Sequence, residues 1–235
     1  MLGLYIGIIL LLNIPYVQHR MSVLVAKELS TVLGSELTVG RINIGLLNRI
    51  IIDDLVLNDQ SGKELLKIGR LSAKFEILPL FSGKISIGNV QLFSFNANLE
   101  RPTPQASTNF QFVLDAFASK DTVKKKSNLD LRINSLLIRR GKVSYDVLSA
   151  ESTPGKFNPQ HIRLSNILAN ISLKALQNDS VNAAIKRMSV EEEHSGFELK
   201  KLSLKIIAND RKMRIENFAI DLPNTSLAMD TIRME

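Results

Sequence analysis

The sequence predicts a mainly β protein, in which an N-terminal membrane helix and an amphipathic helix precede a curved antiparallel β-sheet with one apolar face. Three observations lead to this fold class. An uncharged apolar run opens the chain, apolar residues at helical spacing follow it, and beyond residue 35 a pattern typical of bent strands recurs between residues 39 and 220. We therefore expect an anchor at residues 1–17, a helix at residues 18–34 and a β domain at residues 35–235.

The run between Leu2 and Val17 is expected to be a membrane anchor that is truncated at its start. It contains no charged residue and is dominated by leucine and isoleucine. Its length falls short of the ~20 residues that span a bilayer. No basic segment precedes it and no small-residue cleavage pattern follows it, so a removable signal peptide is not favoured. The apolar anchor residues are Leu4, Ile6, Ile8, Ile9, Leu10, Leu11, Leu12 and Ile14.

Residues 18–34 have the spacing of an amphipathic helix, which we expect to cover the membrane-proximal end of the sheet. Gly34 is expected to end the helix as a C-cap glycine, and Pro15 to kink the chain before it. The expected apolar side carries Val17, Met21, Leu24, Val25, Leu29, Val32 and Leu33. The expected polar side carries Gln18, Arg20, Lys27 and Glu28.

A short pattern predicts the β domain: an apolar residue, two spacers, an apolar residue, one spacer and a third apolar residue. Side chains alternate between faces along a strand, so apolar residues three apart would normally lie on opposite faces. One extra residue between them, a bulge, restores the phase and bends the strand. The pattern therefore predicts bent strands with a single apolar face. It spans residues 39–44, 52–57, 68–73, 87–92, 133–138, 164–169, 199–204 and 215–220.

The strands are expected to form a meander of antiparallel hairpins, interrupted by an insertion at residues 101–128. Apolar and polar residues alternate strictly at 129–134, which predicts a one-sided strand, and the polar cluster at 58–62 predicts a turn. Inside the insertion, residues 109–117 predict a short helix. We expect this helix to dock on the rim of the apolar face through Phe110, Val113, Leu114 and Phe117.

Composition and motifs argue against catalysis. The chain has no Cys, and its three His residues lack metal-ligand spacing. Neither a glycine-rich phosphate loop nor a GxSxG elbow occurs, so we expect no catalytic residue, no metal site and no cofactor, and the chain is not expected to be an enzyme. The net charge of +7 permits anionic partners, but nucleic acid is not expected, because the ten Phe residues are assigned to apolar positions rather than positions among basic residues.

A bent sheet with one apolar face needs a cover, which a second sheet, a layer of helices or an apolar ligand could supply. The helix layer is excluded, because only one short helical segment follows residue 34. The pattern fits a β-sandwich and a ligand-holding groove equally well. A groove is energetically feasible, because each buried methylene contributes ~0.8 kcal/mol and a C16 acyl chain gains on the order of 10 kcal/mol before ordering costs.

Several segments together resemble the TamB branch (translocation and assembly module) of the AsmA-like family, in its Bacteroidota-type members. They are IPYVQ at 14–18, LTVGRI at 37–42, DLVLND at 54–59, LPLFSGK at 78–84, NFQFVLDAF at 109–117 and residues 133–146, which end in GKVSYD. The resemblance covers essentially the whole chain. Full family members are far longer and end in a C-terminal domain that contacts an outer-membrane barrel, so this chain is expected to be a membrane-proximal portion.

The resemblance implies a single-pass inner-membrane protein with its bulk in the periplasm and an open hydrophobic groove, the repeating β-groove of the family. Such proteins are similar to bridge-like lipid transfer proteins, and the implied role is phospholipid transport toward the outer membrane in envelope biogenesis. Phospholipid acyl chains, the inner membrane and an outer-membrane barrel partner are the implied partners. The expected groove-lining residues are Ile85, Ile87, Val90, Leu92, Leu131, Ile133, Leu136, Ile138, Leu164, Ile167, Leu202 and Leu204.

Two other functions remain open. In the first, the chain is a periplasmic assembly factor for outer-membrane or secreted proteins, and the open edge of the sheet near residues 225–232 templates an incoming strand. In the second, it is a closed β-sandwich adhesion domain on a membrane anchor.

Overall fold

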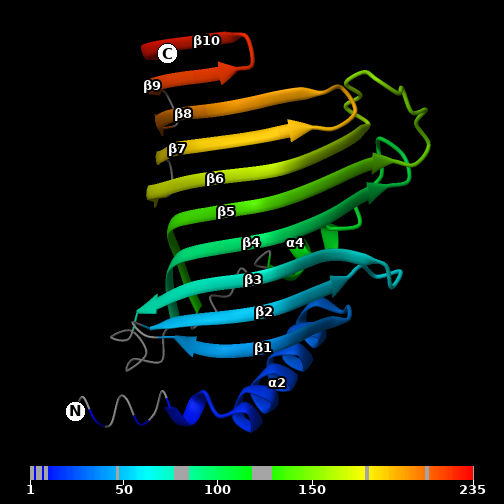
Figure 1. The fold of residues 1–235 in the computed structure, drawn as a ribbon, viewed down its shortest axis with the longest axis vertical. Helices are drawn as coiled ribbons and strands as arrows, with labels where there is room; N and C mark the ends of the chain where they lie inside the picture. The colour runs from blue at the N-terminus through cyan, green and yellow to red at the C-terminus, as the bar shows by residue number, and fades with distance from the viewer. Residues whose placement is uncertain are drawn as a thin grey trace.

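Ten strands form one sheet in the computed structural model, which describes residues 3, 7, 10–45, 48–76, 85–117, 129–177, 180–209 and 212–234. Each strand pairs with its neighbours in chain order, from β1 at one edge to β10 at the other (Figure 1). The strands are β1 (Leu37–Gly45), β2 (Arg49–Asn58), β3 (Glu64–Glu76), β4 (Ile85–Arg101), β5 (Leu129–Val147), β6 (His161–Gln177), β7 (Ser180–Glu192), β8 (Phe197–Asn209), β9 (Met213–Leu222) and β10 (Thr225–Met234). The sheet does not close on itself, and the prediction of a mainly β protein is confirmed.

The pairing of β4 with β5 is parallel, whereas every other neighbouring pair is antiparallel. The prediction of an entirely antiparallel meander is therefore wrong at this pair. Parallel neighbours need a crossover of a dozen or more residues, often with a helix in it. The segment between Arg101 and Leu129 supplies that crossover and contains the helix α4 (Gln111–Phe117).

The helix α2 (Pro15–Leu33) begins earlier than expected, because Pro15 occupies its first turn instead of kinking the chain. Proline fits there, where its missing N–H has no helical partner to lose. Gly34 ends the helix with a left-handed φ of 64° and its N–H donates to the Ser30 carbonyl, which confirms the predicted C-cap.

The faces of α2 differ from the expected ones. Gln18, placed on the polar side by its sequence position, is buried, and its Nε2 donates to Asn43 Oδ1 on β1 at 2.6 Å. Ser22 is also buried, with its hydroxyl donating to the Gln18 carbonyl. Leu24 and Val32 are instead exposed, at 60% and 56%. The sheet-facing side of this helix is partly polar because β1 offers it a polar partner.

No helix within the described part of the chain is long and apolar enough to span a membrane. Of the expected anchor residues, Leu4, Ile6, Ile8 and Ile9 lie outside the described residues. Leu10, Leu11 and Ile14 are largely exposed, and Leu12 is partly exposed.

Apolar residues three apart do lie on one face, as the repeated pattern predicts. Ile52 and Leu55 pack in the same hydrophobic cluster, and so do Leu92 and Phe95. Single residues with left-handed backbone conformations sit between such pairs. They are Asp54, Ser94, Arg140, Asn166 and Asn217, with φ between 51° and 55°.

The strands bring apolar residues three apart onto one face in different ways along the sheet. At Asn217, β9 places two residues opposite one of β8, as in the predicted bulge. Between β1 and β2 the register is unchanged, because Val39 pairs with Leu55 and Arg41 with Asp53. Gly40 therefore lies opposite Asp54. The alternation of side chains between the two faces changes phase in both strands at this point, so neither strand has an extra residue.

Candidate functional site: an apolar face across the sheet

One face of the sheet carries two hydrophobic clusters that share Phe95. The first cluster has the buried residues Leu33, Leu37, Leu55, Leu57, Leu65 and Ile68 at its centre. The second cluster consists of Ile167, Val190 and Leu199, with Phe95, Ile138, Val143, Leu164, Leu202, Ile220 and Leu222 packed against them. The apolar surface is thus continuous from β1 to β9.

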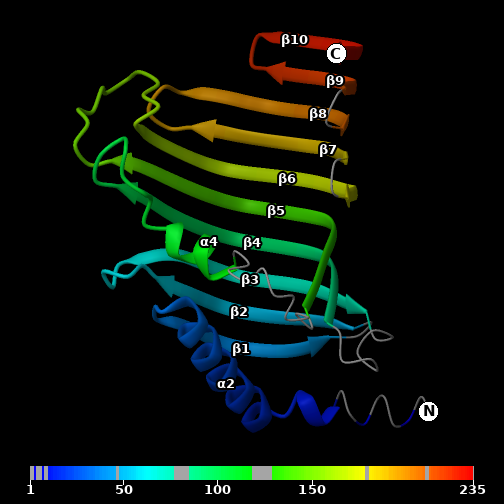
Figure 2. The same cartoon turned by 180° about the vertical axis from the view of Figure 1, so that it is seen from behind.

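Helices cover the first cluster. Leu33 and Leu29 of α2 and Phe112 and Val113 of α4 pack on it, and Leu65 at its centre is only 1% exposed. Both helices lie at the N-terminal end of the sheet, on the face toward the viewer in Figure 2. The exclusion of a helix layer is therefore wrong for this half of the sheet, because the crossover helix and the helix preceding residue 34 together build one.

The docking of the crossover helix was only partly predicted. Phe110 and Val113 pack against the first cluster as expected. Leu114, however, is 52% exposed, since it lies on the side of this short helix that faces away from the sheet. The side chain of Phe117 lies outside the described part.

Strand residues alone form the second cluster, from β4 to β9. Within the described ranges, no helical residue belongs to it. Ile167, Val190 and Leu199 are buried by their neighbours, at 7%, 9% and 8% exposure, while the surrounding members remain partly exposed. This half of the face therefore combines a continuous apolar surface with access from solvent.

Most of the expected lining residues whose side chains are described fall on this face. Leu92 packs against the first cluster, and Ile138, Leu164, Ile167 and Leu202 belong to the second. Val90, Leu136 and Leu204 are partly exposed and lie two positions from Leu92, Ile138 and Leu202, so strand alternation places them on the same face. The strand positions of Ile85, Ile87, Leu131 and Ile133 are described, but not their side chains.

Several residues of the face were not predicted. Val143 and Val190 lie outside the repeated three-residue pattern, and Phe95 follows a second phase change on β4 that the 87–92 segment does not reveal. Gly141 is the useful signal, because a side chain there would overlap the Phe95 ring. A lone glycine within a strand commonly marks such a close approach.

A buried carboxylate lies at one hairpin end of the sheet. Glu192 is 2% exposed at the β7–β8 turn and accepts hydrogen bonds from the backbone N–H groups of Arg163, His194 and Ser195 and from the Ser195 hydroxyl. Burial raises the pKa of this carboxyl, but the hydrogen bonds, led by that of the Ser195 hydroxyl, outweigh burial and lower it to about 2. These contacts cap a turn.

A second ionic group holds the β5–β6 connection. His161 lies with Nδ1 2.9 Å from Asp146 and Nε2 3.0 Å from the Ala150 carbonyl, and Arg163 pairs with the same carboxylate at 2.8 Å. The hydrogen bond to Asp146 is the main reason that the pKa of His161 is raised. Across the described ranges, no three His, Cys, Asp or Glu side chains gather closely enough to hold a metal ion.

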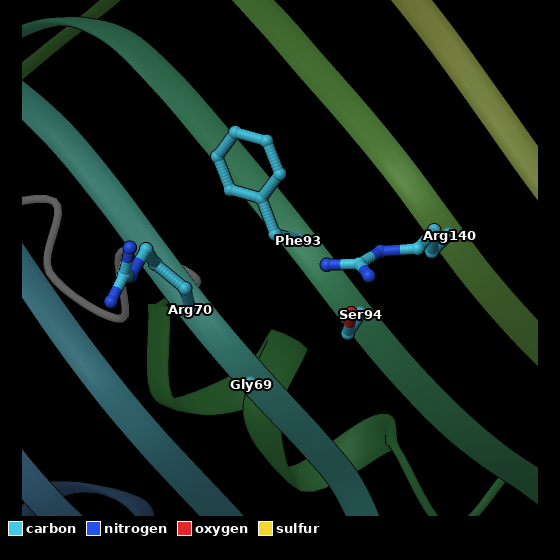
Figure 3. Close-up of a pocket in the computed structure, with 5 residues that line it drawn as sticks. All are labelled: Gly69, Arg70, Phe93, Ser94 and Arg140. Atoms are coloured by element: carbon cyan, nitrogen blue, oxygen red, sulfur yellow. The ribbon is translucent and has the colours of Figure 1, made fainter.

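The opposite face of the sheet is mainly polar, although some apolar residues lie on it and Phe93 is one of them. Phe93 lines a hollow there together with Arg70 and Arg140 (Figure 3). The expectation that all Phe residues occupy apolar positions is therefore wrong at Phe93, because the left-handed Ser94 keeps Leu92 and Phe95 on the apolar face and leaves the residue between them on the other.

Fold and site together define an open, mainly β protein with a helix-covered half and a solvent-accessible apolar half. No protein-family model and no curated protein matches the sequence.

Proposed function

We propose that this chain is a non-enzymatic carrier segment that holds phospholipid acyl chains along the second cluster. The observation that carries the proposal is the composition of that cluster, which is apolar, built from six adjacent strands and only partly buried. When an apolar ligand covers a surface of this kind, the free energy falls because apolar area leaves water.

An acyl chain can cover such a face at a small cost in free energy. Each methylene of an acyl chain that leaves water contributes ~0.8 kcal/mol, so one tail lying across several strands offsets its own ordering cost. The headgroup stays in water at the edge of the face and needs no buried polar partner. Helices α2 and α4 occupy the other half, so the ligand would lie over β4–β9.

The cellular setting rests on the resemblance to TamB-like proteins. It supports a location at the inner membrane with the bulk of the chain in the periplasm, and transport directed toward the outer membrane and a barrel partner there. The exposed Leu10, Leu11 and Ile14 at the N-terminal end are compatible with membrane attachment at that end of the sheet.

Photo-crosslinking at two adjacent positions tests the proposal. A photoreactive phenylalanine analogue replaces Leu202, a member of the second cluster, or Ser203, which strand alternation places on the opposite face. The full chain is incubated with phospholipid vesicles and the adducts are identified by mass spectrometry. We expect phospholipid adducts at position 202 and none at position 203.

Charge substitutions at the same two positions test whether the apolar face is needed for lipid binding. Leu202→Asp should abolish lipid retention while the chain still folds, and Ser203→Asp should leave retention unchanged. Equal crosslinking at both positions would contradict a ligand confined to the apolar face. Unfolding of Leu202→Asp together with absence of adducts at 202 would favour a sealed core instead.

Templating of an incoming β-strand is a second candidate, supported by the free edge of β10. Among the residues that the structure describes, this strand pairs only with β9, and all its residues except Ile232 are exposed. Adjacent backbone N–H groups of a strand point to opposite sides, so one of the positions Ala228 and Met229 directs its N–H toward β9 and the other toward the free edge. Proline at either position removes that single N–H. Templating predicts that only one of these variants loses capture of a strand peptide while remaining folded.

A further inference from the structure

A hollow of about 360 Å³ on the polar face of the sheet is lined by Gly69, Arg70, Phe93, Ser94 and Arg140. Figure 3 shows the Phe93 ring standing above the sheet, with Arg70 on one side and Arg140 on the other. Helix α4 lies behind the sheet in this view, so the hollow is on the side away from the helices.

Strand register brings the arginines to the ring. Arg70 on β3 and Arg139 on β5 are the direct neighbours of Phe93 on β4. Gly69 pairs in the same register with Ser94, and a Cβ at Gly69 would approach the Ser94 Cβ to 3.3 Å. The floor of the hollow is therefore built from small residues that leave the backbone accessible beneath the charged groups.

The charges in the hollow are unevenly compensated. Arg70 donates to Asp53 at 2.6 Å, which fixes its guanidinium. The guanidinium groups of Arg139 and Arg140 have no hydrogen-bond acceptor or ion-pair partner among the residues that the structure describes. Asp54 also faces Arg70, but it lines a neighbouring hollow with Arg41. A positive charge thus remains beside Phe93.

Arg140 also adopts a backbone conformation that arginine rarely takes. Its φ of 55° lies in the left-handed region, where glycine or asparagine fits with less strain. Its side chain is exposed, so packing does not require arginine there. The left-handed conformation belongs to the phase change of the strand, as at Ser94 and Asn166, but neither that conformation nor packing requires an arginine at this position.

We propose that this hollow is a binding site for a phosphoryl group that carries an apolar or ring-shaped substituent. Arg140 would bind the phosphoryl oxygens through its paired N–H groups, with Arg139 adding to the positive field, whereas the charge of Arg70 is already compensated by Asp53. The ring of Phe93 would contact the substituent. The site lies on the face opposite the second cluster, so it does not depend on the proposed carrier function.

Binding of inorganic phosphate to the full chain, measured by isothermal titration calorimetry, is the first test. We expect Arg140→Gln to weaken binding about tenfold or more, as loss of charge-assisted hydrogen bonds does. The matched control is Arg233→Gln on β10, which removes an equal charge from an exposed strand position and should bind as the parent does. Equal affinity of the Arg140→Gln variant and the parent would overturn the proposal.

Arg140→Gly separates binding from folding. Glycine relieves the left-handed backbone, so thermal stability should stay equal or rise while phosphate binding is lost. Retained binding in this folded variant would also overturn the site.

Vesicles distinguish the sources of the phosphoryl group. Arg140-dependent binding to phosphatidylcholine vesicles that contain phosphatidic acid, but not to phosphatidylcholine alone, would assign the site to a lipid headgroup. Binding of free phosphate without vesicle binding would assign it to a soluble phosphate ester. Arg140-dependent binding of single-stranded RNA, with neither phosphate nor vesicles bound, would overturn the proposal in favour of nucleic acid.

Discussion

The ring of Phe95 on β4 lies against the backbone of Gly141 on β5, and this contact joins the two hydrophobic clusters. Phe95 packs in both clusters, and the two residues are direct neighbours in the parallel register of β4 and β5. A Cβ at position 141 would overlap the ring. The helix-covered half of the face and its open half are therefore linked through one aromatic side chain that needs a glycine beneath it.

Gly141→Ala is expected to destabilise the protein by about 1–3 kcal/mol, the usual cost of overpacking a filled site. Urea denaturation followed by circular dichroism measures the loss. The φ of Gly141 is not in the left-handed region, so the cost is steric. The double variant Phe95→Leu/Gly141→Ala should recover part of it, and strictly additive costs would show that the two residues do not interact.

Ser94→Gly is expected to raise the free energy of unfolding by about 1 kcal/mol, because serine at a φ of 53° carries backbone strain that glycine avoids. Ser203→Gly is the matched control, since Ser203 is a strand residue without a positive φ. That control should lose about 0.5–1 kcal/mol through the extra freedom of its unfolded chain. Losses of equal size in both variants would contradict a strained Ser94.

The β character and the single apolar face could be predicted because both depend on local alternation. The spacing of Ile52 and Leu55, or of Leu164 and Ile167, records the phase change directly in the sequence. Whether one strand carries an extra residue, or two strands change phase together as at Gly40 and Asp54, depends on pairing and is not visible in one strand. The parallel β4–β5 pair likewise depends on the path of the crossover.

The orientation of α2 shows where local patterns fail. Helical spacing assigns Gln18 to the polar side, yet Asn43, twenty-five positions away, gives its amide a partner against the sheet. A hydrogen-bond partner supplied by a strand offsets the cost of removing the amide from water. Phe93 shows the converse: an aromatic residue lies on the polar face, where basic residues of the two adjacent strands flank it.

Acidification is expected to destabilise the protein through Glu192. Its pKa falls from the usual 4.5 to about 2 on folding, so the ionised carboxylate stabilises the folded state above pH 4.5. That stabilisation is lost as the pH falls from 4.5 toward 2, and its size is on the order of 3 kcal/mol. Denaturation at a series of pH values measures it.

Glu192→Gln isolates this contribution. The variant should be less stable than the parent at neutral pH and should lose less stability between pH 4.5 and pH 2. The exposed Glu193 next to it provides the control, and Glu193→Gln should keep the acid sensitivity of the parent. A parallel decline of parent and Glu192→Gln across this range would show that the carboxylate does not carry the effect.

The outer side of α2 is expected to contact a lipid surface, as the proposed membrane attachment requires. Tyr16, Val23 and Leu24 are more than half exposed there, beside the exposed Arg20 and Lys27. Burying a leucine side chain contributes roughly 1.5–3 kcal/mol, so Leu24→Asn should weaken binding to phospholipid vesicles about tenfold or more. Vesicle flotation of the full chain measures the bound fraction. Leu227→Asn, at an apolar position of β10 that is also about half exposed, should float as the parent does. If both variants float equally, α2 does not provide the lipid contact.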